Sequence, residues 1–200
     1  MIRAAALLAL GIATGSAGAG EHLLAGARLF RAERWAEALV EFRVAERLGD
    51  SAARGYAAAT LVKLERPEQA VEEFEARGAP PPGRDPLLDY YRAVACHDAR
   101  LYVRADRLLA GIGARTGPGI ARLVADARAE IAAMLRGEPR RDAVEWYVAR
   151  CEDLDRAGRR VLARAFCDEA RGLGERRADR YGVREADAIL AKLGPMAGAR

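Results

Sequence analysis

The chain has 200 residues and a formal net charge of +4, from 33 basic and 29 acidic side chains. Apolar residues make up 51% of it and aromatic residues 6%, and most of the apolar ones are alanine and leucine, which favour helices. The two signs of charge are interspersed, which argues against a nucleic-acid-binding face, and no run alternates at period two as a half-buried strand would.

The first segment, Met1–Ala19, is typical of a secretory signal peptide. It combines Arg3, the apolar stretch Ala4–Ala13 and the small-residue ending Ala17-Gly18-Ala19. The apolar stretch is shorter than the roughly 20 residues that a membrane-spanning helix needs. We therefore expect cleavage near Ala19, export to the periplasm or the cell exterior, and no membrane insertion after cleavage. An uncleaved amphipathic or anchoring helix is the alternative.

Two segments that follow repeat one another. Ala38 stands four residues before Phe42, and Ala70 stands four residues before Phe74, so the step between the copies is 32 residues (70 − 38 and 74 − 42). An acidic residue immediately precedes each phenylalanine. Self-similarity at a fixed period is the sequence sign of a repeat architecture. Two weaker copies are Ala105 with Leu109, and Ala163 with Cys167.

Each of these helices follows another helix that carries a small residue at mid-length. In the first copy, Gly26 and Leu29 precede Ala38, Phe42 and Ala45. This order of small and large residues resembles the tetratricopeptide repeat (TPR), whose unit is an antiparallel helix pair. The corresponding positions in the other copies are Ala58, Leu61, Ala70 and Phe74; Ala93, Cys96, Ala105 and Leu109; and Cys151, Leu154, Ala163, Cys167 and Ala170.

The resemblance implies an all-α fold, a right-handed α-solenoid with about 9–10 helices after the signal peptide. The chain divides into the signal peptide (1–19), TPR-like repeats over 20–112 (about 20–50, 51–79 and 85–112), and degenerate TPR-like helices with a C-terminal capping helix over 113–200. The consecutive prolines of Ala79–Gly83 separate the second and third repeats, because proline is not tolerated inside a helix. A generic bundle of alanine-rich hairpins is the alternative fold.

The C-terminal region is expected to contain a helical hairpin with two cysteines. Periodicity predicts helices over Gly119–Arg136, Asp142–Arg156 and Arg159–Leu173, and a terminal helix that ends at Leu193. If the second and third form a hairpin, Cys151 and Cys167 face the seam between them, and we predict a disulfide there. Two free thiols that act as small buried apolar residues are the alternative. Cys96 is expected to be buried and unpaired.

Catalytic and metal-binding patterns are not found in the sequence. Histidine occurs only at His22 and His97, and neither has a second histidine at metal-ligand spacing. Ser51, Thr60 and Thr116 are the only Ser or Thr residues after the signal peptide, and neither a nucleophile elbow nor a phosphate-binding loop is present. We therefore expect no enzymatic activity, no metal and no cofactor.

The TPR resemblance implies a concave face lined by the first helix of each pair, which suits a peptide or helix of a protein partner. We expect Tyr90 to be the anchor of this groove, since aromatic residues carry much of the binding energy at interfaces. The predicted role is a protein-binding scaffold or assembly adaptor of the cell envelope. Alternatives are a structural self-associating repeat module, an accessory subunit of an envelope enzyme or secretion complex, or an enzyme. The sequence identifies neither the partner nor the oligomeric state. The groove residues are Leu23, Ala27, Phe30, Ala59, Val62, Leu87, Tyr90, Val94 and His97.

Overall fold

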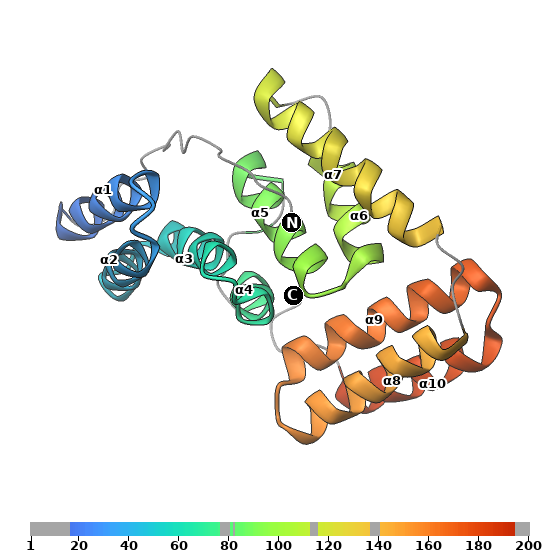
Figure 1. Ribbon diagram of the computed structural model, residues 1–200. Coiled ribbons are helices and arrows are strands. Elements are labelled where there is room, and N and C mark those ends of the chain that lie inside the picture. The colour runs from blue at the N-terminus through green and yellow to red at the C-terminus, as the bar shows by residue number, and fades with distance from the viewer. Residues whose placement is uncertain (1–16, 77–80, 82, 113–115, 137–140, 195–200) are drawn as a thin grey trace.

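The computed structural model describes residues 17–76, 81, 83–112, 116–136 and 141–194 (Figure 1). Over these residues the chain forms ten helices and no strand, so the prediction of an all-α fold is confirmed for them. The helices are α1 (Ala17–Arg31), α2 (Trp35–Arg47), α3 (Ser51–Lys63), α4 (Pro67–Glu75), α5 (Pro86–Asp98), α6 (Tyr102–Ile112), α7 (Pro118–Arg136), α8 (Arg141–Arg156), α9 (Arg160–Arg177) and α10 (Arg180–Leu193).

Helices that are consecutive in sequence pack against one another along most of the chain. The pairs α1–α2, α3–α4 and α5–α6 lie side by side, and α7 covers α5 and α6 (Figure 1). Helices α8, α9 and α10 form a three-helix unit, which contacts α4 and α6 through α9. The core therefore runs as a continuous apolar layer from the first pair to the last helices.

The turns inside four helix pairs share one backbone conformation. In the turn between α3 and α4, Glu65 has φ 57°. Its N–H donates to the carbonyl of Val62, and the N–H of Arg66 donates to that of Leu61. This is the hydrogen-bond pattern of a Schellman C-cap, in which a left-handed residue satisfies the last carbonyls of a helix. Inside the other three pairs, the left-handed residues with the same two bonds are Glu33, Arg100 and Gly158. The same bonds also form at Gly49, between α2 and α3, and at Ala178, between α9 and α10.

The repeated turn sets the register of the second helix in each pair. After each turn, an alanine N–H donates the first hydrogen bond of the second helix. The acceptor is the backbone carbonyl of the residue that follows the left-handed residue. The four alanines are Ala38, Ala70, Ala105 and Ala163. All four alanines are fully buried. The sequence comparison placed these four alanines at equivalent positions, and the structure gives them equivalent surroundings.

Close packing in the first pair depends on a glycine. A Cβ at Gly26 would lie 2.7 Å from two ring carbons of Phe42, which is far below van der Waals contact. The ring of Phe42 is fully buried and stacks on Tyr56 of α3, with centroids 5.6 Å apart. One phenylalanine thus joins the first pair to the second.

The C-terminal unit docks on the array through a carboxylate that caps another helix. Glu169 of α9 is 1% exposed, and its two oxygens accept hydrogen bonds from the N–H groups of Val103 (2.7 Å) and Arg104 (3.1 Å). These groups belong to the first turn of α6, where the preceding Leu101 has no side-chain acceptor. Glu169 therefore acts as the N-cap of α6, although it lies 66 residues from Val103 in sequence.

The expected disulfide is present. Cys151 of α8 and Cys167 of α9 are bonded, with their Cα atoms 5.4 Å apart, and both are buried. Cys96 is a buried free thiol, as predicted. The helix that contains Cys167 is longer than predicted and continues from Leu173 to Arg177. Gly174 in this stretch packs closely on α10, since a Cβ there would lie 2.8 Å from Val183.

The bounds of α7 and α8 and the end of α10 agree with the bounds predicted from the sequence to within one residue. Residues 1–16 of the predicted signal peptide and most of the proline connector lie outside the described residues, while Ala17–Ala19 begin α1. Among the helices that the structure describes, none has the length and apolar character needed to cross a membrane.

Candidate functional site

The residues expected to line the groove are buried, apart from the partly buried Val62. Tyr90, the expected anchor, is 0% exposed. Helix α5 is enclosed by α3, α4, α6 and α7, and Phe30 of α1 meets the ring of Tyr91 edge-on with centroids 5.9 Å apart. In this conformation these side chains form packed interior, so the expectation of an open groove anchored by Tyr90 is not met.

The structure brings part of the predicted set together between α5 and α7. Burial, and then Tyr91 and nearby carboxylates that include Asp126 and Glu130 of α7, raise the pKa of Tyr90 above its usual value. The Nδ1 of His97 lies 2.9 Å from a carboxylate oxygen of Asp98, and its Nε2 lies 3.8 Å from one of Glu130. Within the described residues the hydroxyls of Tyr90 and Tyr91 have no hydrogen-bond partner.

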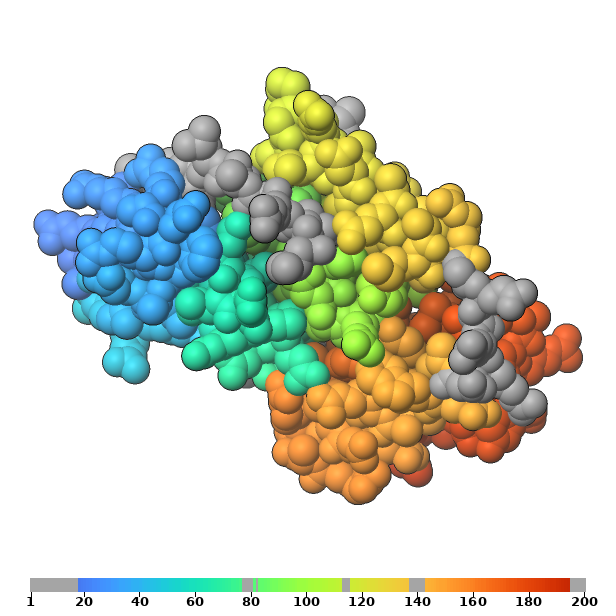
Figure 2. Space-filling model, viewed as in Figure 1, coloured from blue at the N-terminus to red at the C-terminus, as the bar shows by residue number. Residues whose placement is uncertain are grey.

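An open cleft of about 490 Å³ lies where the array meets the C-terminal unit. The space-filling view shows the surfaces of α4 and of the α8–α9 region adjoining each other (Figure 2). The cleft is lined by the start of α4, the α5–α6 turn, the middle of α8 and one ring of α9. The lining residues are Pro67, Glu68, Asp98, Ala99, Arg100, Trp146, Ala149, Arg150, Asp153 and Phe166.

Trp146 is the prominent apolar group of this cleft. It is 44% exposed, although its indole packs edge-on against Tyr147 at 4.8 Å and lies 6.1 Å from the ring of Phe166. Tyr147 is buried, and its hydroxyl donates to the backbone carbonyl of Arg100. This bond ties the α5–α6 turn to α8 and so holds two walls of the cleft together.

Ion pairs join α4 to the C-terminal unit along the cleft. Glu68 accepts from Arg150 (2.7 Å) and Arg159 (2.8 Å), and Arg159 also donates to both oxygens of Glu72. Burial disfavours the charged form of Glu68, but the two guanidinium groups outweigh it and lower the pKa of that carboxyl. The Glu68 carboxylate is therefore committed to the contact between the two parts of the molecule.

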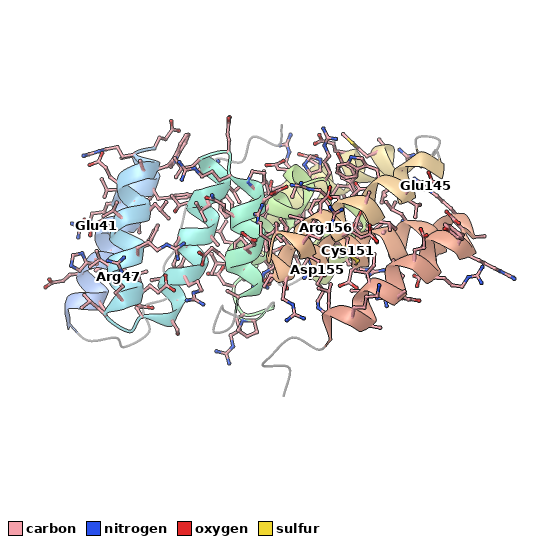
Figure 3. The ribbon with its side chains drawn as sticks, turned by 90° about the horizontal axis from the view of Figure 1, so that it is seen from below. Glu41, Arg47, Glu145, Cys151, Asp155 and Arg156 are labelled. Carbon is pink, nitrogen blue, oxygen red and sulfur yellow. A yellow bond between two sulfur atoms is a disulfide. The ribbon has the colours of Figure 1, made fainter. Side chains whose placement is uncertain are left out.

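The side-chain view separates α8 from α2. Cys151, Asp155 and Arg156 of α8 lie among the C-terminal helices near the middle of the view, whereas Glu41 and Arg47 of α2 lie at the N-terminal end of the molecule (Figure 3). The cysteine bridge follows Arg150 and Phe166 directly in sequence. It thus fixes the positions from which these two cleft side chains project.

Sequence reasoning did not find this cleft. Glu68 and Arg150 are 82 residues apart, so no spacing within one helix could associate them. The one available signal was Trp146 itself, one of two tryptophans in the chain. It adjoins the buried Tyr147 and therefore points to another side of α8.

The chemistry that the cleft offers is recognition by rings, guanidinium groups and carboxylates. Its lining contains no Ser, Thr, Cys, His or Lys side chain, and so no nucleophile of those kinds beside a base. Within the described residues no group of three or more His, Cys, Asp and Glu side chains is placed to hold a metal ion.

No protein-family model, curated protein or solved structure matches this chain.

Proposed function

We propose that this chain is an exported, non-enzymatic binding protein built on TPR-like helix pairs, which acts as a scaffold or assembly adaptor in the cell envelope. Its partner is a protein or peptide. The repeated Schellman turns, the equivalent buried alanines and the side-by-side packing of α1–α6 support a repeat architecture, and stacked helix pairs typically serve as extended binding surfaces.

The observation that carries the proposal is the exposed Trp146 at a cleft assembled from two parts of the chain. Tryptophan and arginine are enriched among the residues that dominate binding energy at protein interfaces. Here both line a concave surface whose volume is in the range of peptide or ligand sites. A purely structural module has no need of an indole exposed in this way.

The disulfide supports the cellular location in the proposal. Disulfides persist in oxidising compartments such as the periplasm and are rare in the cytosol. A buried Cys151–Cys167 bridge is therefore consistent with export through the predicted signal peptide.

Site-specific photocrosslinking in the native cell tests this function. A photoreactive amino acid is placed at Ala149 in the cleft, at Val62 of the predicted groove, or at the exposed Arg47 at the far end of the array. We expect a defined protein adduct from Ala149 or Val62 and none from Arg47. Adducts formed only with a second copy of this chain, or equal labelling from all three positions, would reject the adaptor role.

A further inference from the structure

One wall of the cleft is a ladder of two neighbouring rings with a cation over each. The guanidinium of Arg100 lies over the ring of Trp146 at 6.0 Å, and that of Arg150 lies over the ring of Phe166 at 5.8 Å. The two rings are themselves 6.1 Å apart. The order along the wall is therefore Arg100, Trp146, Phe166, Arg150, with a cation at each end.

The two ends of this ladder differ in their counter-ions. Arg150 donates to Glu68 at 2.7 Å, so its charge is compensated within the molecule. Arg100 is exposed, and no carboxylate among the described residues forms an ion pair or hydrogen bond with its guanidinium. The Arg150 end thus displays the interaction that the Arg100 end lacks.

The remaining carboxylates of the cleft already have partners. Asp98 lies 2.9 Å from the Nδ1 of His97, and Asp153 accepts from Arg156 at 2.6 Å. Arg100 is therefore the one charged residue of the lining whose side chain has no polar partner in the described part of the chain. Because its guanidinium is next to an exposed indole, a carboxylate bound there would adjoin an apolar surface.

Two bonds brace the cleft at this point. The Arg100 carbonyl is held by the Tyr147 hydroxyl, and the disulfide pins α8 to α9 immediately beside Arg150 and Phe166. A site whose groups are already in place loses little conformational entropy when a ligand binds.

We propose that this cleft binds a peptide segment in which an acidic side chain adjoins an apolar one. The carboxylate pairs with Arg100, and the apolar side chain packs on Trp146. This inference rests on the proposed binding function and adds to it the location and the chemistry of the ligand. A volume of about 490 Å³ accommodates a few residues of such a segment.

The test is selection of short random peptides, displayed on phage without a free carboxyl terminus, against the purified full chain. Enriched peptides are synthesised with an amidated terminus, and binding is followed by Trp146 fluorescence in a Trp35→Phe background, since Trp35 is the only other tryptophan. We expect Asp or Glu next to an apolar residue in the selected peptides. Replacing that acid by its amide should weaken binding about tenfold, as for loss of a charged hydrogen bond.

Variants of Arg100 assign the effect to this cleft. Arg100→Gln should weaken binding of the selected peptide by a similar factor. Arg100→Glu should abolish binding of that peptide, but it should bind the peptide whose acidic residue is replaced by lysine. Arg47→Gln and Arg47→Glu make the same charge changes on the exposed far end of α2 and should leave the affinity unchanged. Arg100 is an exposed turn residue, so these variants should melt like the wild type.

Two outcomes would overturn the proposal. Selected peptides that bind Arg100→Gln as well as they bind wild type place the peptide site away from Arg100. Selection that enriches basic or purely apolar peptides rejects the acidic ligand in the same way. Failure of the adaptor function itself is read separately, from the photocrosslinking at Ala149 and Val62.

Discussion

Gly26 and Phe42 meet across the first two helices, and Cys151 and Cys167 occupy the same two positions in the pair α8–α9. The members of each pair are 16 residues apart (42 − 26 and 167 − 151). Each pair spans a left-handed turn residue, Glu33 in the first case and Gly158 in the second. In both cases the first residue of the pair stands seven positions before the turn residue, and the second stands nine positions after it. A contact made by a glycine and a ring in one pair is made by a covalent bond in the other.

This contact predicts that Gly26→Ala destabilises the protein although alanine is the better helix former. The new Cβ would lie 2.7 Å from the buried ring of Phe42, and such overpacking costs about 1–3 kcal/mol. The helix-propensity gain of about 1 kcal/mol offsets only part of that cost. Chemical denaturation measures the difference. Gly111→Ala is the matched control, because a Cβ there would meet no packing neighbour within 4 Å, and it should not destabilise.

A double-mutant cycle shows whether the ring causes the effect. In a Phe42→Ala background the space beside Gly26 is open, so Gly26→Ala should become neutral or stabilising. If the two substitutions are additive, the close approach of Gly26 to Phe42 is not what limits this position.

Removal of the phenylalanine ring between the two helices of a pair should lower the stability of the protein. Phe42 and Phe74 are buried at equivalent positions of the first two pairs, and we expect about 3–5 kcal/mol of lost stability from Phe42→Ala and from Phe74→Ala. Val40→Ala, on the exposed face of the same helix as Phe42, should change stability by less than about 0.5 kcal/mol. Near-wild-type thermal melting of both phenylalanine variants would contradict the packing described here.

The disulfide should contribute about 3 kcal/mol, the amount expected when a short loop is closed in the unfolded chain. Reductant should lower the stability of the wild type by that amount, but it should not affect a Cys151→Ala/Cys167→Ala variant. Alkylation of the denatured, non-reduced protein should modify Cys96 alone. In the folded protein that thiol should resist alkylation, because burial, the largest effect, raises the pKa of Cys96 to about 12. Three modified thiols in the denatured sample would show that the bridge does not form.

Glu169 predicts a specific pH dependence. Burial raises the pKa of its carboxyl from 4.5 to about 7, and this effect exceeds the opposing one of the hydrogen bonds from Val103 and Arg104. The folded state therefore holds this proton more tightly than the unfolded state. The resulting stability is fully present below pH 4.5 and is lost as the pH rises through 7. The change is on the order of 3 kcal/mol.

Comparison of Glu169→Gln with the wild type isolates this contribution, since other carboxylates titrate in both proteins. The stability difference between the two should shift across pH 4.5–7 and be constant above that range. Glu152→Gln, an exposed change on α8, should give a profile parallel to the wild type. A parallel profile for Glu169→Gln as well would show that folding does not raise the pKa of this carboxyl.

Local sequence patterns predicted the helical content, the four equivalent alanines and, with two free thiols as the alternative, the pairing of Cys151 with Cys167. Each of these depends on residues that lie within about two helices of one another, where helical periodicity alone decides which side chains meet. The spacing of Gly26 from Phe42 and of Cys151 from Cys167 is of this kind, and both contacts were therefore accessible from the printed chain.

Only the tertiary structure decided which faces stay open. Periodicity shows that one side of α5 is apolar, but the further helices that cover it, and with it Tyr90, depend on how successive pairs stack. The cleft and the cap of α6 arise in the same way. Glu68 meets Arg150 and Glu169 meets Val103 only after α9 has packed on α4 and α6. These contacts join residues more than sixty positions apart, and chain connectivity places no constraint on them until the pairs have packed.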